Sequence, residues 1–227
     1  AAAGADPDSW DSMDERTRHT FLAAFFAGGH DVIVGRRHFT DDAVDTSALA
    51  ASGTLSVAEH RAYMHLAIHA MQSLYEANRW VRYVAVFQNW LRPAGASFDH
   101  LHKQLVGIDE RGVTSQLELQ KVRVNPNLYN EMAVDYAAYQ GLLVASNEHA
   151  VAFAGFGHRY PTLEVYSTSA MPEPWLMSRE EVDAVADLVH ALHAATGADV
   201  PSNEEWHHKP IDVDQPMPWH ITLKWRV

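Results

Sequence analysis

Two histidines and a glutamine alternate with other residues in the segment His100-Leu-His102-Lys-Gln104. Side chains of a β-strand point alternately to opposite faces, so in a strand these three side chains share one face. The loop before them contains Gly95 and Ser97, and small residues let backbone amides approach a phosphate closely. Imidazole can carry a covalent nucleotidyl group, and a glutamine amide can hold a phosphate oxygen. The segment therefore predicts a strand that supports phosphoryl or nucleotidyl transfer through histidine.

Composition excludes several classes of protein. The 227 residues suit one large domain or two small ones. A net charge of -12 is the opposite of the basic footprint that nucleic-acid binding needs, so no nucleic-acid partner is expected. No apolar run approaches the ~20 residues of a membrane span, and no signal peptide is visible, so we expect a cytoplasmic protein without a membrane partner. The chain starts with Ala1 rather than Met, which leaves open whether a segment precedes it.

The residue counts also bear on metal chemistry. Cysteine is absent, which excludes disulfides and thiolate metal ligands. The chain has 15 histidines, and this number favours metal or phosphate chemistry for some of them. No organic cofactor is expected.

Apolar patterns and capping signals divide the first half of the chain into elements. Ser56 and Glu59 form the capping box of a long helix that ends near Asn78. The other expected elements are a helix at 9–26, strands at 30–35, 80–89 and from His100 to Gly107, a strand or extended arm at 117–124, and a helix at 128–143.

The second half repeats this order in a weaker form. Two strands at 149–156 and 162–167 are followed by a helix that Ser178 caps, with Glu181 completing its capping box, and by a terminal strand at 219–225. The repeat predicts an α+β protein of two lobes, each an antiparallel β-sheet with packed helices. We place the first lobe at 1–146, with the His-x-His-x-Gln segment, and the second at 147–227.

These residues resemble the signature of the galactose-1-phosphate uridylyltransferase family, a branch of the histidine-triad superfamily. The signature is an asparagine, a loop with glycine and serine, and then His-Pro-His-x-Gln. The matching positions keep the family spacing, and Leu101 replaces the usual proline; they are Asn89, Gly95, Ser97, His100, His102 and Gln104. The resemblance extends from about His30 to the C-terminus, and it implies that both lobes have the histidine-triad fold.

The resemblance implies a nucleotidyltransferase of carbohydrate metabolism. His102 would attack the α-phosphorus of a nucleoside-diphosphate sugar or related nucleotide, and a phosphate or sugar-phosphate acceptor would then take the nucleotide. Gln104 would hold the phosphate, while Asn89, Gly95 and Ser97 would line the nucleotide site. A homodimer is a family-level expectation.

The resemblance also implies metal sites. A structural zinc in the family uses two cysteine-type ligands, a histidine after an early strand and the first histidine of the signature. Here His38 and His100 match the two histidines. A second site, for iron or another zinc, would use Glu118, His207 and His220, and Thr222 stands where a further histidine is expected. Zinc can also take histidine and carboxylate ligands alone.

Less specific roles stand beside each of these. His38 could be an ordinary loop histidine, His207 an exposed one in a polar loop, His220 a core histidine, and Glu118 a solvated carboxylate. The helical pairs His65/His69 and His190/His193 are expected in surface or core roles. For the whole chain, the alternatives are a histidine-triad hydrolase or phosphorylase, and a catalytically silent nucleotide- or metal-binding module. The base and the sugar cannot be read from the sequence.

Overall fold

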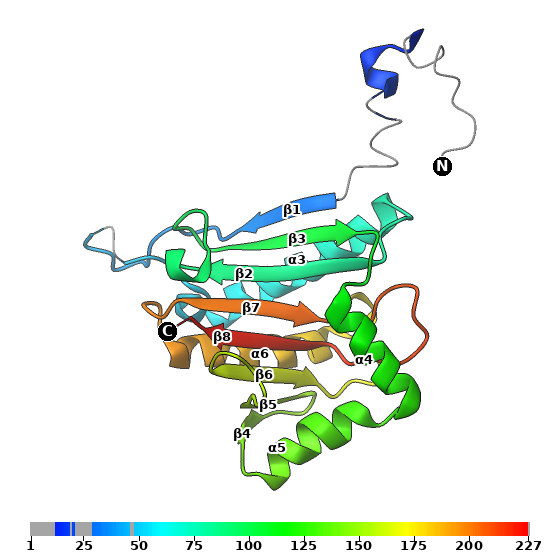
Figure 1. Cartoon of the computed structure of the whole chain (residues 1–227). Coiled ribbons are helices and arrows are strands. Elements are labelled where there is room, and N and C mark those ends of the chain that lie inside the picture. Colours follow the sequence, from blue (N-terminus) through cyan, green and yellow to red (C-terminus); the bar gives the residue numbers. More distant parts are fainter. Residues whose placement is uncertain (1–11, 19, 21–28, 46–47, 227) are drawn as a thin grey trace.

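The fold is built on one eight-stranded antiparallel sheet (Figure 1). The structure is a computed structural model, and it describes residues 12–18, 20, 29–45 and 48–226. The strands lie in the order β1-β3-β2-β7-β8-β6-β5-β4. Their bounds are β1 Gly29–Val34, β2 Tyr83–Trp90, β3 His102–Ile108, β4 Leu143–Ser146, β5 Ala150–Ala154, β6 Thr162–Ser167, β7 Ser202–His207 and β8 His220–Trp225.

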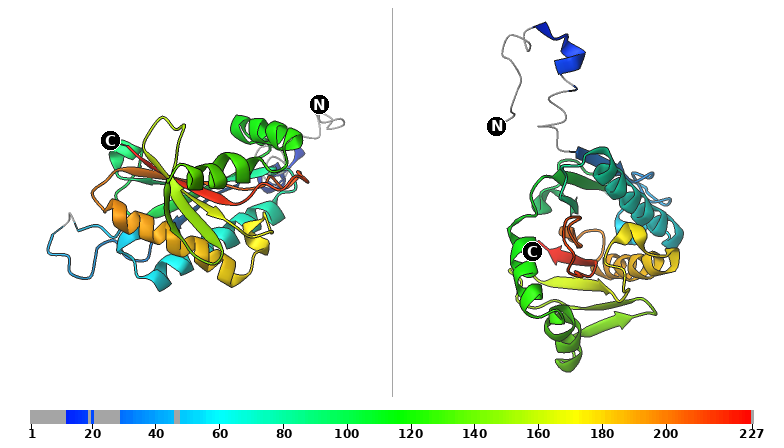
Figure 2. Two further views of the ribbon diagram at one scale, coloured as in Figure 1. Left: turned by 90° about the horizontal axis from the view of Figure 1, so that it is seen from below. Right: turned by 90° about the vertical axis from the view of Figure 1, so that its right-hand side faces the viewer.

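Two long helices cover one face of the sheet. Helix α3 (Val57–Ala77) and helix α6 (Arg179–Thr196) lie side by side behind the sheet in Figure 1, and Figure 2 shows them from two other sides. Each begins after the predicted N-cap serine. The side chain of Ser56 accepts a hydrogen bond from the backbone N–H of Glu59, and the side chain of Ser178 accepts one from the backbone N–H of Glu181. An N-cap serine stabilises a helix by about 1 kcal/mol. The core lies between this helix pair and the sheet, and it includes Met64, Met71, Leu105, Val185 and Trp219.

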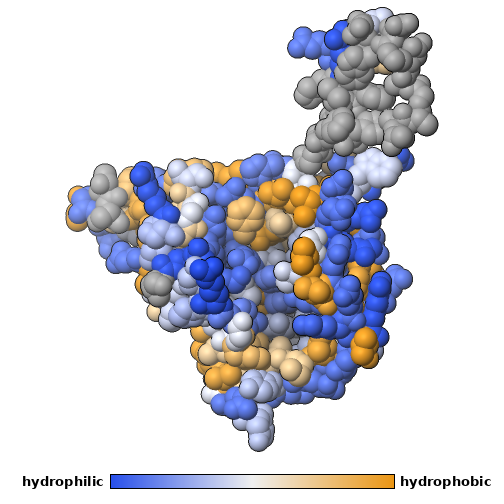
Figure 3. Space-filling model, in the orientation of Figure 1, coloured by the Kyte–Doolittle hydropathy of each residue, from blue (hydrophilic) through white to orange (hydrophobic). Residues whose placement is uncertain are grey.

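The other face of the sheet is only partly covered. Helix α4 (Val113–Val124) crosses the end of the sheet on this face, and a π-helical turn (Asn130–Val134) leads into the short helix α5 (Asp135–Tyr139) (Figure 1). Short 3-10 turns lie at Ser52–Thr54, Arg92–Ala94 and Pro174–Leu176. Over the middle of the sheet this face is hollowed (Figure 3). No helix of the described ranges is both long and apolar enough to cross a membrane.

The predicted α+β fold with antiparallel strands and packed helices is confirmed, and most predicted elements have a counterpart. The expected helix at 9–26 falls largely outside the described residues. The prediction of a strand or extended arm at 117–124 is wrong, because this segment belongs to α4. The polar loop expected around His207 is also wrong, because β7 continues to His207. The helix expected at 128–143 is interrupted by the π-helical turn and ends at Tyr139.

The two halves of the chain share the sheet. Strand β7 pairs with β2 on one side and with β8 on the other, which joins the halves through backbone hydrogen bonds. The predicted boundary at 146 coincides with the end of β4, and β4 pairs with β5 of the second half. The division into lobes at 146 stays a prediction.

Candidate active site

The sheet register brings the predicted nucleophile strand beside polar residues of both halves. Phe87 of β2 lies opposite Gln104 of β3 on one side and opposite Glu205 of β7 on the other. Because side chains alternate along each strand, His102 and Asn89, each two residues further along, lie on the same face. This is the face that α3 and α6 leave uncovered, and we call it the open face.

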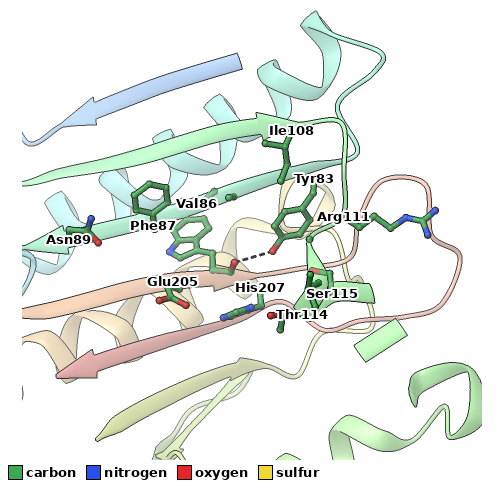
Figure 4. A pocket seen from close by; sticks show the side chains of 14 residues that line it. Tyr83, Val86, Phe87, Asn89, Ile108, Arg111, Thr114, Ser115, Glu205 and His207 are labelled. Carbon is green, nitrogen blue, oxygen red and sulfur yellow. Dashed lines mark hydrogen bonds between the residues drawn. The ribbon is translucent and has the colours of Figure 1, made fainter. Parts of the chain in front are cut away.

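A cavity of about 450 Å³ lies on the open face (Figure 4). Its lining runs from Asn89 and Phe87 of β2 to the beginning of α4, where Thr114 and Ser115 stand. On the β7 side, the cavity is bordered by Glu205 and His207. A volume of this size is typical of a small-molecule site.

The imidazole of His102 is held in one tautomer. Its Nδ1 lies 2.7 Å from the carbonyl oxygen of His100. A carbonyl can only accept, so Nδ1 carries the proton and donates it. In the neutral imidazole, Nε2 is then the nitrogen with the free lone pair; it is buried, and it makes no hydrogen bond to any described residue. A neutral imidazole in this tautomer is prepared to act as a nucleophile through Nε2.

An aromatic ring covers this histidine. The rings of Phe98 and His102 stack with centroids 4.0 Å apart and planes 21° apart. His102 is only 2% exposed, whereas Phe98 is 44% exposed. The sequence analysis did not select Phe98, although an aromatic residue just before the signature histidines was a visible signal.

An asparagine pair fixes the loop before β3. The side-chain amide of Asn203, on β7, donates to Asn89 Oδ1 and to the carbonyl of Ala94, both at 2.7 Å. Asn89 in turn donates to the carbonyl of Gly95 at 3.4 Å. Gly95 has a φ of 89°, which favours glycine. Ser97 stays exposed further along this loop. Asn89 of β2 thus contacts Gly95 of the loop, Ser97 makes no hydrogen bond with either of these two described residues, and Asn203 is an additional contact of this loop that the sequence analysis missed.

His38 and His100 form a hydrogen-bonded pair. His100 Nε2 lies 2.7 Å from the carbonyl of Gly35 and must donate to it, which leaves His100 Nδ1 as an acceptor. His38 Nδ1 lies 2.8 Å from that nitrogen and therefore donates to it. The pair ties the segment after β1 to the segment before β3.

The described residues do not complete a zinc site around this pair. A structural zinc is held by four ligands, and His38 and His100 supply two nitrogens. No group of three or more histidine, aspartate or glutamate side chains that could hold a metal occurs in the described ranges. The zinc implied by the resemblance stays a prediction.

Replacing His38 by alanine should lower the free energy of unfolding by about 1 kcal/mol, because one hydrogen bond is lost. Denaturant unfolding of His38→Ala measures this, with His69→Ala on the exposed side of α3 as the control. An unfolding free energy equal to that of the control would contradict the role of the pair. Elemental analysis of the same proteins tests the predicted zinc. If the wild type and the control bind one zinc per chain and His38→Ala binds none, the remaining ligands must come from outside the described residues.

The second predicted metal group does not converge. Glu118 lies on α4 and accepts a hydrogen bond from Tyr129 at 3.1 Å, and burial raises its pKa. The rings of His207 and His220 stack with centroids 4.7 Å apart. His220 Nδ1 lies 2.9 Å from the carbonyl of Pro218 and donates to it. Burial, with a smaller effect of Lys224, lowers the pKa of His207 to about 4. These two histidines are neutral neighbours on the open face, and their predicted role as metal ligands stays a prediction.

Buried neutral histidines should make stability depend on pH. Burial, with a contribution from His220, lowers the pKa of His208 to about 3. In the unfolded chain a histidine titrates near 6.5, so below that pH the unfolded state binds more protons and stability falls as pH decreases. His208 alone should contribute a loss of about 2 kcal/mol between pH 7.5 and pH 5. Urea unfolding at both pH values should show this loss in the wild type and a smaller one in His208→Gln; equal losses would contradict the assignment.

Comparison with known proteins identifies the family of the chain and solved structures with a similar fold. The model of a family described as a domain of unknown function, DUF4921, matches residues 1–227. No curated protein matches the chain. Among solved structures, a uridylyltransferase is 18% identical with a TM-score of 0.70, over 87% of this chain and 64% of its own.

Two plant structures are similar to the same extent. A GalT-like protein from Arabidopsis thaliana is 17% identical with a TM-score of 0.72, over 87% of this chain and 66% of its own. An ADP-glucose phosphorylase from Arabidopsis thaliana, with bound ADP-glucose, is 16% identical with a TM-score of 0.70, over 88% of this chain and 64% of its own. The chain therefore spans slightly less than two thirds of the length of these proteins. The chain belongs to the DUF4921 family, and it has the fold of the uridylyltransferases, as its signature residues predict.

Proposed function

We propose that this protein transfers a nucleotidyl group from a nucleoside-diphosphate sugar, or a related nucleotide, to a phosphate-bearing acceptor. One observation carries the proposal: His102 Nδ1 donates a hydrogen bond to the His100 carbonyl, and the buried Nε2 has no hydrogen-bond partner among the described residues. A nucleophile needs this arrangement, in which one ring nitrogen is oriented and the other has a free lone pair.

The proposed reaction has two displacements at the same phosphorus. Nε2 attacks the α-phosphorus, a P–N bond forms, and the bond from phosphorus to the bridging oxygen breaks, which releases the sugar phosphate. A phosphate oxygen of the acceptor then attacks the same phosphorus, the P–N bond breaks, and Nε2 regains its lone pair. The loop held by Asn89 and Asn203 would receive the phosphates through its backbone amides, and Gln104 would donate to a phosphate oxygen.

The cavity on the open face supports a nucleotide-sugar substrate, and of the predicted site residues Asn89 and His207 line it while His102 and Gln104 do not. The cavity begins at Asn89, beside the proposed phosphate site, and its 450 Å³ leaves room for a sugar. Glu205 and His207 along its border offer polar groups to hydroxyls. The names of two structural neighbours, a uridylyltransferase and an ADP-glucose phosphorylase, agree with substrates of this class.

Inorganic phosphate is a second candidate acceptor, because one neighbour of the same fold is a phosphorylase. Chromatography of products from UDP-glucose or ADP-glucose, incubated with galactose 1-phosphate, inorganic phosphate or no acceptor, distinguishes transfer, phosphorolysis and hydrolysis. Transfer gives a new nucleotide sugar, phosphorolysis gives a nucleoside diphosphate, and hydrolysis gives a nucleoside monophosphate without acceptor. Binding of these donors without any product would instead favour a silent nucleotide-binding module.

A further inference from the structure

A fully buried ion pair lies directly behind the open face. Gln88 of β2 and Glu204 of β7 are register partners, and Lys103 of β3 stands next to Gln88 on the other side. The ammonium of Lys103 donates to Glu204 Oε1 at 2.5 Å and to Gln88 Oε1 at 3.1 Å. The side chains of Lys103 and Glu204 are 0% exposed. The Lys103 ammonium thus links β3, β2 and β7 on the face of the sheet that α3 and α6 cover.

The Glu204 carboxylate is also tied to other elements. His193 of α6 donates from Nε2 to Oε2 at 2.7 Å, and the indole nitrogen of Trp206 donates to Oε1 at 2.6 Å. Although burial by itself raises the pKa of Glu204, Lys103 and His193 hold that pKa below its usual value. Glu204 is therefore the charged centre of a network that joins three strands to α6.

Each strand residue of this network has an open-face residue as its neighbour in the chain. Lys103 stands between His102 and Gln104, Gln88 precedes Asn89, and Glu204 follows Asn203. A slip of one residue in any of these strands would exchange the buried and open faces. Burying an unpaired ammonium or carboxylate costs several kcal/mol, so a register that separated this pair would be strongly disfavoured.

We propose that Lys103 and Glu204 are positioning residues, which fix β3, β2 and β7 in the register that sets His102 against the loop held by Asn89 and Asn203. This inference rests on the proposed function. A buried ion pair is often replaceable by uncharged side chains without loss of stability, so overall stability alone does not require this one. Its specific effect is to hold Nε2 of His102 and the phosphate-binding loop at a constant separation, and small displacements of a nucleophile cost much of its rate.

The test compares two uncharged double variants. Lys103→Met/Glu204→Gln removes both charges and keeps the side-chain shapes, which avoids the unfolding that a single unpaired charge could cause. Arg61→Met/Asp187→Asn is the matched control. The Arg61 guanidinium and the Asp187 carboxylate are 2.6 Å apart and join α3 to α6, and they do not lie on the open face. Both are measured for thermal unfolding, for the rate of nucleotidyl-histidine formation at saturating UDP-glucose or ADP-glucose, and for the donor concentration that gives half that rate.

We expect the Lys103/Glu204 variant to form the adduct at least 10-fold more slowly at saturating donor, with the half-saturating concentration changed less than 3-fold. The control should keep the wild-type rate at a similar melting temperature. A folded Lys103/Glu204 variant with the wild-type rate, or an equal rate loss in the control, would overturn the inference while adduct formation by the wild type still supports the proposed function. A folded wild type that forms no adduct and leaves every donor unconsumed refutes the proposed function, and the inference falls with it.

Discussion

Replacing His102 by alanine should lower the proposed nucleotidyl transfer by at least about 1,000-fold, because the step that activates the donor is lost with the proposed nucleophile. The fold should persist. The hydrogen bond to the His100 carbonyl and the stacking on Phe98 are the contacts that the substitution removes, and the buried network of Lys103 lies on the opposite face. Steady-state turnover with the donor identified by product analysis measures the effect.

The matched control is His69→Ala, which removes an exposed histidine of α3 and should keep wild-type turnover. His102→Gly should recover part of its activity with free imidazole, which can occupy the space of the missing ring. Turnover of His102→Ala within 10-fold of the wild type, in purified and folded protein, is incompatible with His102 as the nucleophile.

Replacing Gly53 by alanine should lower the free energy of unfolding by about 3 kcal/mol, at the upper end of the range for overpacking. A β-carbon at this position would stand 2.5 Å from the backbone nitrogen of Ala194 and 2.5 Å from the carbonyl carbon of His193. Backbone atoms of a helix cannot move aside as a flexible side chain can. The 3-10 turn at Ser52–Thr54 must then separate from α6, and α6 carries the His193 partner of Glu204.

Gly141→Ala provides the comparison. Its β-carbon would meet nothing within 4 Å, but its φ of 68° is unfavourable for alanine, so about 1 kcal/mol should be lost. Denaturant unfolding of both variants gives the two free energies. If Gly53→Ala were no less stable than Gly141→Ala, the close approach of the turn to α6 would not exist in the protein.

Local signals in the sequence were sufficient where a short segment determines its own structure. Ser56 with Glu59 and Ser178 with Glu181 begin the two long helices as predicted, because a capping box involves only four consecutive residues. The alternation of His102 and Gln104 likewise predicted that both side chains share one face of β3, but His100, predicted in the same strand, lies before it. The carbonyl that fixes the His102 tautomer is that of His100, and no sequence pattern identifies it.

Packing decided the segments where the sequence pattern fits two structures. Leu117, Leu119, Val122 and Val124 are compatible with either alternation or a helical face. Leu119 and Val122 are buried at helical spacing, and Leu119 packs with Val213 and Met217, almost 100 residues later in the chain. Contacts over that separation cannot be read from a local window, and they make this segment a helix.

The network behind the site depends on such distant partners as well. A lysine between His102 and Gln104 predicts only that its side chain faces away from theirs. That it is buried follows from Glu204, 101 residues later, and Asn203 meets Asn89 across 114 residues. Sequence reasoning therefore selected the residues proposed to react but not the residues proposed to position them.

The most direct measurement is the intact mass of the purified chain after incubation with UDP-glucose, UDP-galactose, ADP-glucose or GDP-mannose in the absence of an acceptor. We expect one donor to add the mass of its nucleoside monophosphate less one water, with the adduct mapped to His102 and absent in His102→Ala. An unchanged mass with every donor, in folded protein that leaves each donor unconsumed, would contradict nucleotidyl transfer through His102.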